Sequence, residues 1–187
     1  MLLALDSRWR RFNDPDYVCS QSGKSFSGVF DIGYDAPDSW PHAIPRDAGT
    51  AEVAVGDDKL SADLCRLEDT RFVHCILPLP IKGSDEVFNF GPWAAVESET
   101  FYAYIDHATG AVASFAGGAG FLMNDLPGFE SDDVTACDLR GGPDGQRPQL
   151  FARQGPLARA QTDGISFDEL LDIYAATGTD VRPHLNG

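Results

Sequence analysis

The stretch from Lys59 to Val96 constrains the fold of this chain more than any other, because it contains the densest apolar run, RFVHCILPLPI. Apolar and polar residues alternate over 60–67, which predicts a strand. After a polar break, residues 71–79 are rich in branched and aromatic side chains, which predicts a second strand. Because the break is short, we expect the two strands to form an antiparallel hairpin.

The register of this hairpin is predicted by placing Leu67 opposite Arg71, which also places Cys65 opposite Val73. Successive side chains of a strand point to opposite faces. The face predicted to enter the core carries Cys65, Leu67, Val73, Cys75, Leu77 and Leu79. The other face, which includes His74, is mixed in polarity and is predicted to be half covered.

The pattern after this hairpin predicts a third strand and then a helix. The strand covers 87–96 and is interrupted at Gly91-Pro92, which indicates a bulge or a bend directly before Trp93. Apolar residues then recur at helical spacing, which predicts a helix over 97–107.

The C-terminal half predicts a second hairpin and a second helix. Its strands are predicted over 134–139 and 148–152, on either side of the loop RGGPDGQR. The helix is predicted over 166–177, and Ser166 with Glu169 forms a capping box at its start. A short strand is also predicted at 17–19.

Length and pattern together predict one α+β domain. A chain of 187 residues is long enough to build a hydrophobic core without staples. We expect an antiparallel sheet of about five strands with a few packed helices. Residues 1–16 are predicted to be an N-terminal extension, 17–178 the domain and 179–187 a C-terminal tail. Residues 41–58 and the glycine-rich segment 110–120 are predicted to be loops.

The formal net charge of −15 limits the possible partners. Nucleic acid and anionic membranes would be repelled, so neither is expected as a partner. The charge serves solubility, or it forms an acidic surface for a basic protein partner. There is neither a long apolar span nor a secretory signal, so we expect a cytoplasmic protein with four reduced cysteines. The oligomeric state is left open.

The chain is predicted to hold no metal ion and no cofactor. Cys19 begins a turn in which a second cysteine would complete a C-x-x-C metal motif, but Ser22 occupies that position, and a structural zinc needs four ligands. A degraded zinc site remains a weaker alternative. Asp31, Asp35 and Asp38 do not match the spacing of a twelve-residue calcium loop.

No catalytic residue is predicted from the sequence. A cysteine nucleophile needs a nearby base, and His74 and Cys75 are strand neighbours whose side chains point to opposite faces. The alternative from another class is a hydrolase-like enzyme that uses Cys65 or Cys75 with His74.

The predicted function is instead a non-catalytic binding or protein-interaction module. The GSDE turn, the Gly91-Pro92-Trp93 bend and the loop FDIGYDAPDSW place aromatic residues beside carboxylates. If these loops cluster, they form a shallow binding surface. The predicted binding residues are Asp35, Trp40, Ser84, Asp85, Glu86 and Trp93. The competing interpretation is that both tryptophans only fill the core.

Several segments together resemble a bacterial family of uncharacterised proteins, domain of unknown function 2199. They are Tyr17 with Cys19, DIGYDAPDSW, SADLC, LPLPIKGSDEVFNFGPWAAVES, LPGF and RPQLFARQGPLARAQTDGIS, which extend over about residues 17 to 178. Family members commonly carry a cysteine where this chain has Ser22, and a histidine where it has Gly155. If either position binds a metal in the family, this chain has lost that ability. The resemblance implies no established activity, substrate or cofactor.

Overall fold

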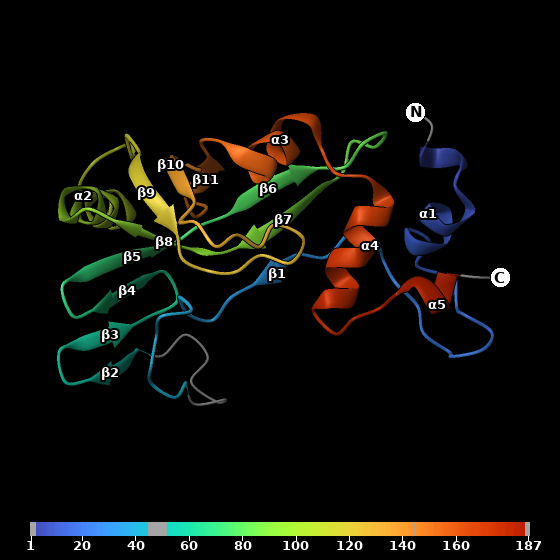
Figure 1. The fold of residues 1–187 in the computed structure, drawn as a ribbon, viewed down its shortest axis with the longest axis horizontal. Coiled ribbons are helices and arrows are strands. Elements are labelled where there is room, and N and C mark those ends of the chain that lie inside the picture. The colour runs from blue at the N-terminus through green and yellow to red at the C-terminus, as the bar shows by residue number, and fades with distance from the viewer. Residues whose placement is uncertain (1–2, 45–51, 144, 186–187) are drawn as a thin grey trace.

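The protein folds into two sheets flanked by helices (Figure 1). The computed structural model describes residues 3–44, 52–143 and 145–185. The larger sheet is antiparallel, and its strands in spatial order are β11 (Gln149–Ala152), β10 (Ala136–Arg140), β9 (Gly118–Leu122), β8 (Trp93–Val96), β5 (Thr70–His74), β4 (Leu64–Leu67), β3 (Asp58–Leu60) and β2 (Val53–Val55).

The smaller sheet contains three strands. Their order is β1 (Ile32–Gly33), β7 (Val87–Gly91) and β6 (Leu77–Pro80). Strand β1 runs parallel to β7, and β6 is antiparallel to it. The helices are η1 (Leu3–Leu5), α1 (Ser7–Phe12), α2 (Ser98–Ala108), α3 (Gly155–Asp163), α4 (Phe167–Ala176) and α5 (Arg182–Leu185).

The α+β class and the antiparallel pairing are confirmed, but the prediction of about five strands is wrong, because the larger sheet has eight. Strand β2 lies in the segment predicted to be loop and is short and largely exposed. Strand β3 begins at the last residue of that segment and ends at the buried Leu60. A third missed strand, β9, lies in the glycine-rich segment. The short strand predicted at 17–19 is absent from the described structure.

The strand predicted over 60–67 is a hairpin, because the chain reverses at 61–63. Leu60 pairs with Cys65, and the backbone N–H of Ser61 donates to the carbonyl oxygen of Leu64 at 2.8 Å. The hydroxyl of Ser61 accepts the N–H of Leu64 at 3.1 Å, which closes the turn locally. Because the chain reverses, Leu60 lies on the same face as its partner Cys65 and on the face opposite to that of Leu64.

The predicted register between β4 and β5 is wrong by one residue. Leu64 pairs with Val73 and Cys65 with Phe72, and the connecting loop has two residues, Glu68 and Asp69. Glu68 takes a left-handed conformation with φ 50°, and its N–H donates to a carboxylate oxygen of Asp58 at 2.9 Å. A slip of one residue reverses the faces, so Cys65 and Cys75 lie on opposite sides of the sheet rather than on one.

The strands predicted over 71–79 and 87–96 exist, but each is divided between the two sheets. His74 pairs with Trp93 and Leu77 with Phe90, so the register continues across the division. At the division, the N–H of Ile76 donates to the carbonyl oxygen of Pro148, the residue before β11, and the carbonyl oxygen of Ile76 accepts the N–H of Leu150 on β11. These bonds replace those to Gly91 and give the predicted bend. One long hairpin therefore joins the two sheets.

Strand β9 lies inside the larger sheet, between β8 and β10, where its glycines leave space for their neighbours. A Cβ on Gly120 would lie 2.8 Å from the carbonyl oxygen of Ala95 and 2.8 Å from a methyl carbon of Leu139. A Cβ on Gly118 would lie 2.5 Å from the hydroxyl oxygen of Thr100 on α2. Close packing, rather than flexibility, explains these two glycines.

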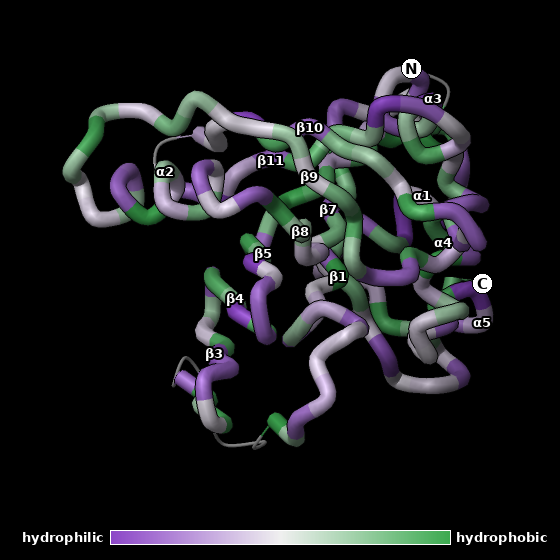
Figure 2. Tube along the Cα trace, turned by 60° about the vertical axis from the view of Figure 1, so that its left-hand side comes forward, coloured by the Kyte–Doolittle hydropathy of each residue, from purple (hydrophilic) through white to green (hydrophobic). Residues whose placement is uncertain are grey.

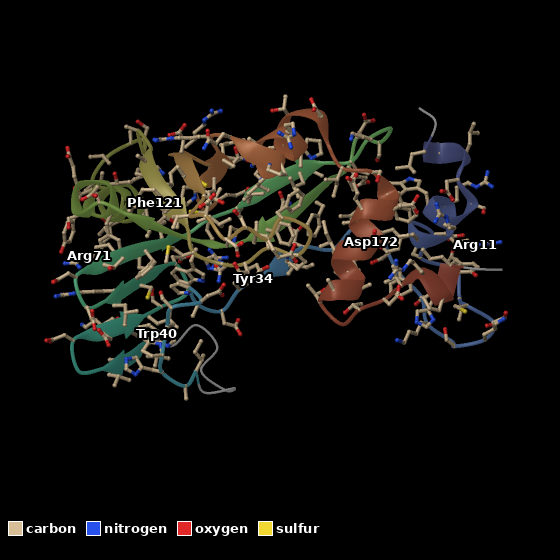
Figure 3. The ribbon with its side chains drawn as sticks, in the orientation of Figure 1. Arg11, Tyr34, Trp40, Arg71, Phe121 and Asp172 are labelled. Carbon is tan, nitrogen blue, oxygen red and sulfur yellow. The ribbon has the colours of Figure 1, made fainter. Side chains whose placement is uncertain are left out.

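Apolar side chains cover both faces of the long hairpin. The main cluster includes Val73, Cys75, Leu77, Phe88, Phe90 and Ala94 together with the buried residues of the helices. The second cluster contains Trp40, Leu60, Cys65, Phe72 and Trp93. Figure 2 shows apolar colour along the central strands, and Figure 3 shows Trp40 beside the outer strands of the larger sheet. On the strand predicted over 71–79, the face that carries His74 is partly covered, since Phe72 and His74 are buried while Ile76 and Pro78 are partly exposed.

Both predicted helices are confirmed, as α2 and α4, and the capping box of α4 is present. Helix α3 was not predicted. It begins with Gly155 and Pro156, and Leu157 is its one buried residue among those described. Proline suits the first turn of a helix, where its missing N–H has no partner to lose.

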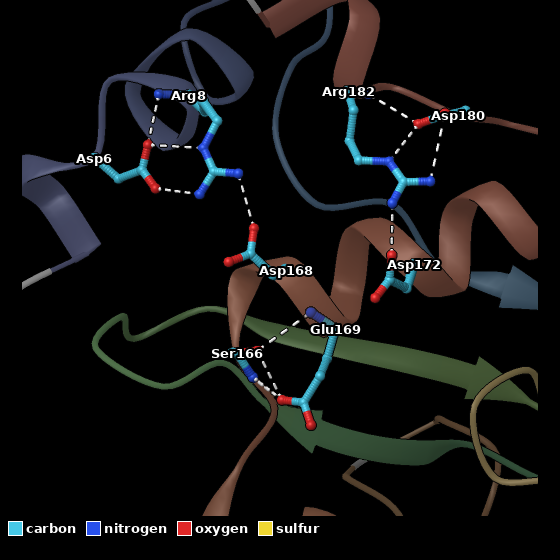
Figure 4. Close-up of polar contacts among 8 residues, drawn as sticks. All are labelled: Asp6, Arg8, Ser166, Asp168, Glu169, Asp172, Asp180 and Arg182. Atoms are coloured by element: carbon cyan, nitrogen blue, oxygen red, sulfur yellow. Dashed lines mark hydrogen bonds and ion pairs between the residues drawn. The ribbon is translucent and has the colours of Figure 1, made fainter.

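The terminal helices α1 and α5 pack around α4. Phe12 is fully buried and lies 5.7 Å from the ring of Phe167. Arg8 pairs with Asp168 at 2.8 Å, and Arg182 pairs with Asp172 at 2.6 Å (Figure 4). The division into an extension, a domain and a tail stays a prediction.

Candidate functional site

His74 lies at the junction of the two sheets and is nearly buried, with 8% of its surface exposed. Its ring stacks on Trp93 at a centroid distance of 4.6 Å and an interplanar angle of 12°. Its Nδ1 lies 2.8 Å from the carbonyl oxygen of Ala62, and its Nε2 lies 2.8 Å from that of Gly91. Since both nitrogens contact the backbone, neither is available to activate a nucleophile in this conformation.

The four cysteines are free and buried. Burial raises the pKa of the Cys65 thiol to about 12 and that of Cys137 to about 11, and it also raises the pKa of Cys75. The hydroxyl of Ser22 lowers the pKa of Cys19, but this side chain is only 1% exposed. Nucleophilic cysteines are accessible thiolates, and none of these four has both properties.

Among the residues that the structure describes, no group of three or more histidine, cysteine and acidic side chains gathers closely enough to hold a metal ion. Asp31 accepts hydrogen bonds from the backbone and side chain of Asn89. Asp38 is bonded to the segment after β9, and Asp35 is exposed. These three carboxylates therefore serve separate contacts.

The structure does not bring the six predicted binding residues together. Asp35 and Trp40 lie on the loop after β1, and Trp93 lies next to that loop, since its Nε1 donates to the carbonyl oxygen of Tyr34 at 2.9 Å. The turn 84–86 lies at the opposite end of β7 (Figure 1). Both tryptophans are buried, with exposures of 9% and 1%, so they support the surface from beneath.

The loop after β1 instead meets the segment that follows β9. Together they form an acidic groove with a volume of about 270 Å³, lined by residues 38–39, 122–126, 129 and 131–135. Its carboxylates come from Asp38, Asp125, Asp132 and Asp133. The last three are exposed, and no ion pair joins them to a basic side chain in the described ranges.

Asn124 holds the floor of the acidic groove. It is 5% exposed, its Oδ1 accepts the backbone N–H of Trp93 at 2.8 Å, and its Nδ2 donates to Asp38 Oδ1 at 2.7 Å. The other carboxylate oxygen of Asp38 accepts the backbone N–H of Asp125 at 2.7 Å. Both ends of the buried Asn124 amide are therefore hydrogen-bonded, so the floor is firmly positioned.

Apolar surface adjoins this groove. Val134 lines it and is 73% exposed, and Leu122, at the end of strand β9, and Phe129 line it as well. The wall turns at Leu126-Pro127-Gly128, where Gly128 has a φ of 84°. In the sequence, the run SDDV at 131–134 already combines acidic and apolar residues. Its position next to Asp38, however, depends on strand β9, which was not predicted.

Comparison with known proteins yields one family. A family described as an uncharacterized protein conserved in bacteria (DUF2199) matches residues 18–165, which is more than half of the chain. No curated protein and no solved structure matches the chain. Within the described ranges, no helix has the length and apolar character needed to cross a membrane.

Proposed function

Because the chain belongs to DUF2199, a family of uncharacterised bacterial proteins, we propose a function from its own surface. The protein is a non-catalytic interaction module, and its acidic groove binds a basic segment of a protein partner. The observation that carries this proposal is the combination of exposed, unpaired carboxylates with an exposed apolar wall around a preformed hollow.

Charge supports a basic partner. Asp125, Asp132 and Asp133 converge on one groove of a chain whose net charge is −15. Complementary charge accelerates association and selects partners, so lysine or arginine side chains are the expected contacts. The same field repels phosphate groups, which disfavours nucleic acid.

The apolar wall supports a partner segment that also carries apolar side chains. In the free protein the exposed side chain of Val134 lowers solubility. Contact with an apolar side chain of the partner would bury it. Side chains of alternating character on an extended segment would meet the carboxylates and the apolar wall in turn.

The alternative of a hydrolase-like enzyme that uses Cys65 or Cys75 with His74 gains no support from the geometry. Both thiols are buried and their pKa values are raised, so they carry little thiolate at neutral pH. His74 already contacts two carbonyl oxygens.

The proposal is tested with a short fluorescein-labelled peptide in which arginine and leucine alternate, followed by fluorescence anisotropy. We expect saturable binding that weakens as salt is added. The double variant Asp132→Asn/Asp133→Asn is expected to weaken binding about tenfold, as the loss of two moderate ion pairs predicts.

A matched control separates the groove from general charge. The variant Asp85→Asn/Glu86→Gln removes the same two charges from the turn at the far end of β7, which was itself a predicted binding site. It is expected to change affinity less than about twofold. Equal weakening by both variants, or no saturable binding by the wild type, would contradict the proposal.

A further inference from the structure

The hydrogen bonds that His74 can make depend on how many protons its ring carries. A neutral imidazole has one N–H and one lone pair, whereas an imidazolium has two N–H groups. Nδ1 and Nε2 each lie 2.8 Å from a backbone carbonyl oxygen, of Ala62 and of Gly91. Carbonyl oxygens only accept, so both contacts are hydrogen bonds only when the ring is doubly protonated.

Each of the two carbonyl oxygens has a second donor that does not titrate near neutral pH. The oxygen of Ala62 also accepts Nη2 of Arg147 at 3.1 Å, and that of Gly91 also accepts the N–H of Tyr34 at 3.1 Å. Loss of the ring proton therefore leaves neither carbonyl without a partner. The junction tolerates both protonation states, and they differ by one hydrogen bond.

The charged groups that face the ring act on it in opposite directions. Asp63, before β4, and Arg147, before β11, pair at 2.6 Å. Burial is the largest influence on the ring and lowers the pKa of His74, and the charge of Arg147 lowers it too. The two carbonyl oxygens and Asp63 act in the opposite direction. Trp93 covers one face of the ring, and an indole face attracts a cation.

We propose that His74 is a proton-operated clamp that positions Trp93 and, through Asn124, the floor of the acidic groove. The imidazolium ties both the loop at Ala62 and the bend at Gly91 to β5. The neutral ring keeps the bond to Gly91, which lies between the two sheets, and releases Ala62, which lies in a partly exposed loop. The consequence for binding rests on the proposed function of the groove.

The protonation state is tested directly by nuclear magnetic resonance of the ring nitrogens in uniformly ¹⁵N-labelled wild-type protein. We expect only Nε2 of His74 to carry a proton at about pH 7.5 and Nδ1 to gain one as the pH falls, with a midpoint below the ordinary value near 6.5 because burial lowers the pKa. The backbone signals of Ala62 and Trp93 should move with the same midpoint. A ring that stays neutral down to about pH 5, or one that titrates without moving these signals, would overturn the clamp.

A second measurement follows the groove. Affinity for the arginine–leucine peptide is expected to rise about threefold to tenfold as the pH falls from about 7.5 through the midpoint of the His74 ring, the worth of about one hydrogen bond. His74→Gln should remove this dependence, and His107→Gln, which changes a histidine on α2, should keep it. An equal pH dependence in both variants would contradict the link from His74 to the groove.

The two proposals fail in distinguishable ways. If the peptide does not bind at any pH, the proposed function is wrong, and the nitrogen signals still decide whether His74 is a clamp. If the ring does not titrate while the peptide binds, the proposed function of the groove is supported and the proposed clamp is wrong.

Discussion

At the scale of single residues, the most reactive side chains of this protein, its thiols and the imidazole of His74, lie packed in the interior. Cys65 and Trp93 lie in one buried cluster, and Cys75 lies in the other, on the opposite side of the sheet. The ring of His74 is held by two carbonyl oxygens. Burial that makes a thiol inert also makes it a good small apolar filler.

The thiols are accordingly expected to react slowly with a disulfide exchange reagent in the native protein. Each cysteine is at most 1% exposed, and burial raises the pKa of Cys65 to about 12. The reaction should accelerate in denaturant, and Cys19 should react first because Ser22 lowers its pKa. A Cys19→Ser variant identifies that thiol. Rapid labelling of Cys65 under native conditions would contradict this picture and revive the nucleophile.

At the scale of elements, strand β9 shows how glycine permits a close fit. Gly118 faces Thr100 of α2, and Gly120 faces the carbonyl oxygen of Ala95. Without β9, strands β10 and β11 would not join the rest of the larger sheet. The groove depends on this connection, because one of its walls follows β9 directly.

Substitution Gly120→Ala is expected to lower the free energy of unfolding by about 1–3 kcal/mol, because the added methyl overpacks the sheet. Gly33→Ala is the matched control, since a Cβ there meets no atom within 4 Å. Its effect should stay within about 0.5 kcal/mol. Chemical denaturation of both variants measures the difference. Equal stability would show that β9 is loosely packed after all.

At the scale of the whole molecule, the ends of the chain contribute to one core. Helix α4 lies outside the matched family region, yet Phe167, Leu170, Leu171, Ile173 and Tyr174 are all buried. Phe12 of α1 packs on two of these rings, at 5.7 Å from Phe167 and 6.1 Å from Tyr174. The predicted boundary after residue 16 is therefore open to a direct energetic test.

Phe12→Ala is expected to cost about 3–5 kcal/mol, as for other fully buried aromatic residues. Arg10→Ala changes an exposed residue of the same helix and should cost at most about 0.5 kcal/mol. Thermal or chemical unfolding of the full chain compares them. If Phe12→Ala leaves stability unchanged, residues 1–16 act as an extension separate from the domain, as the sequence predicts.

The sequence by itself determined the elements whose signals are local. Helices α2 and α4, the bend at Gly91-Pro92 and the hairpin of β10 and β11 were predicted because spacing, caps and turn residues act over a few positions. The family resemblance was also readable from the order of short segments, and the match to residues 18–165 confirms it.

The tertiary structure decided what depends on contacts between distant segments. The hairpin at 61–63, the register of Cys65 and the place of β9 follow from which strand lies next to which, and a slip of one residue reverses a face. The groove likewise exists only because Asp38 and Asn124, far apart in the sequence, are bonded in the fold. Local sequence patterns depend on a residue and its near neighbours, whereas a site forms where segments far apart in the sequence come into contact.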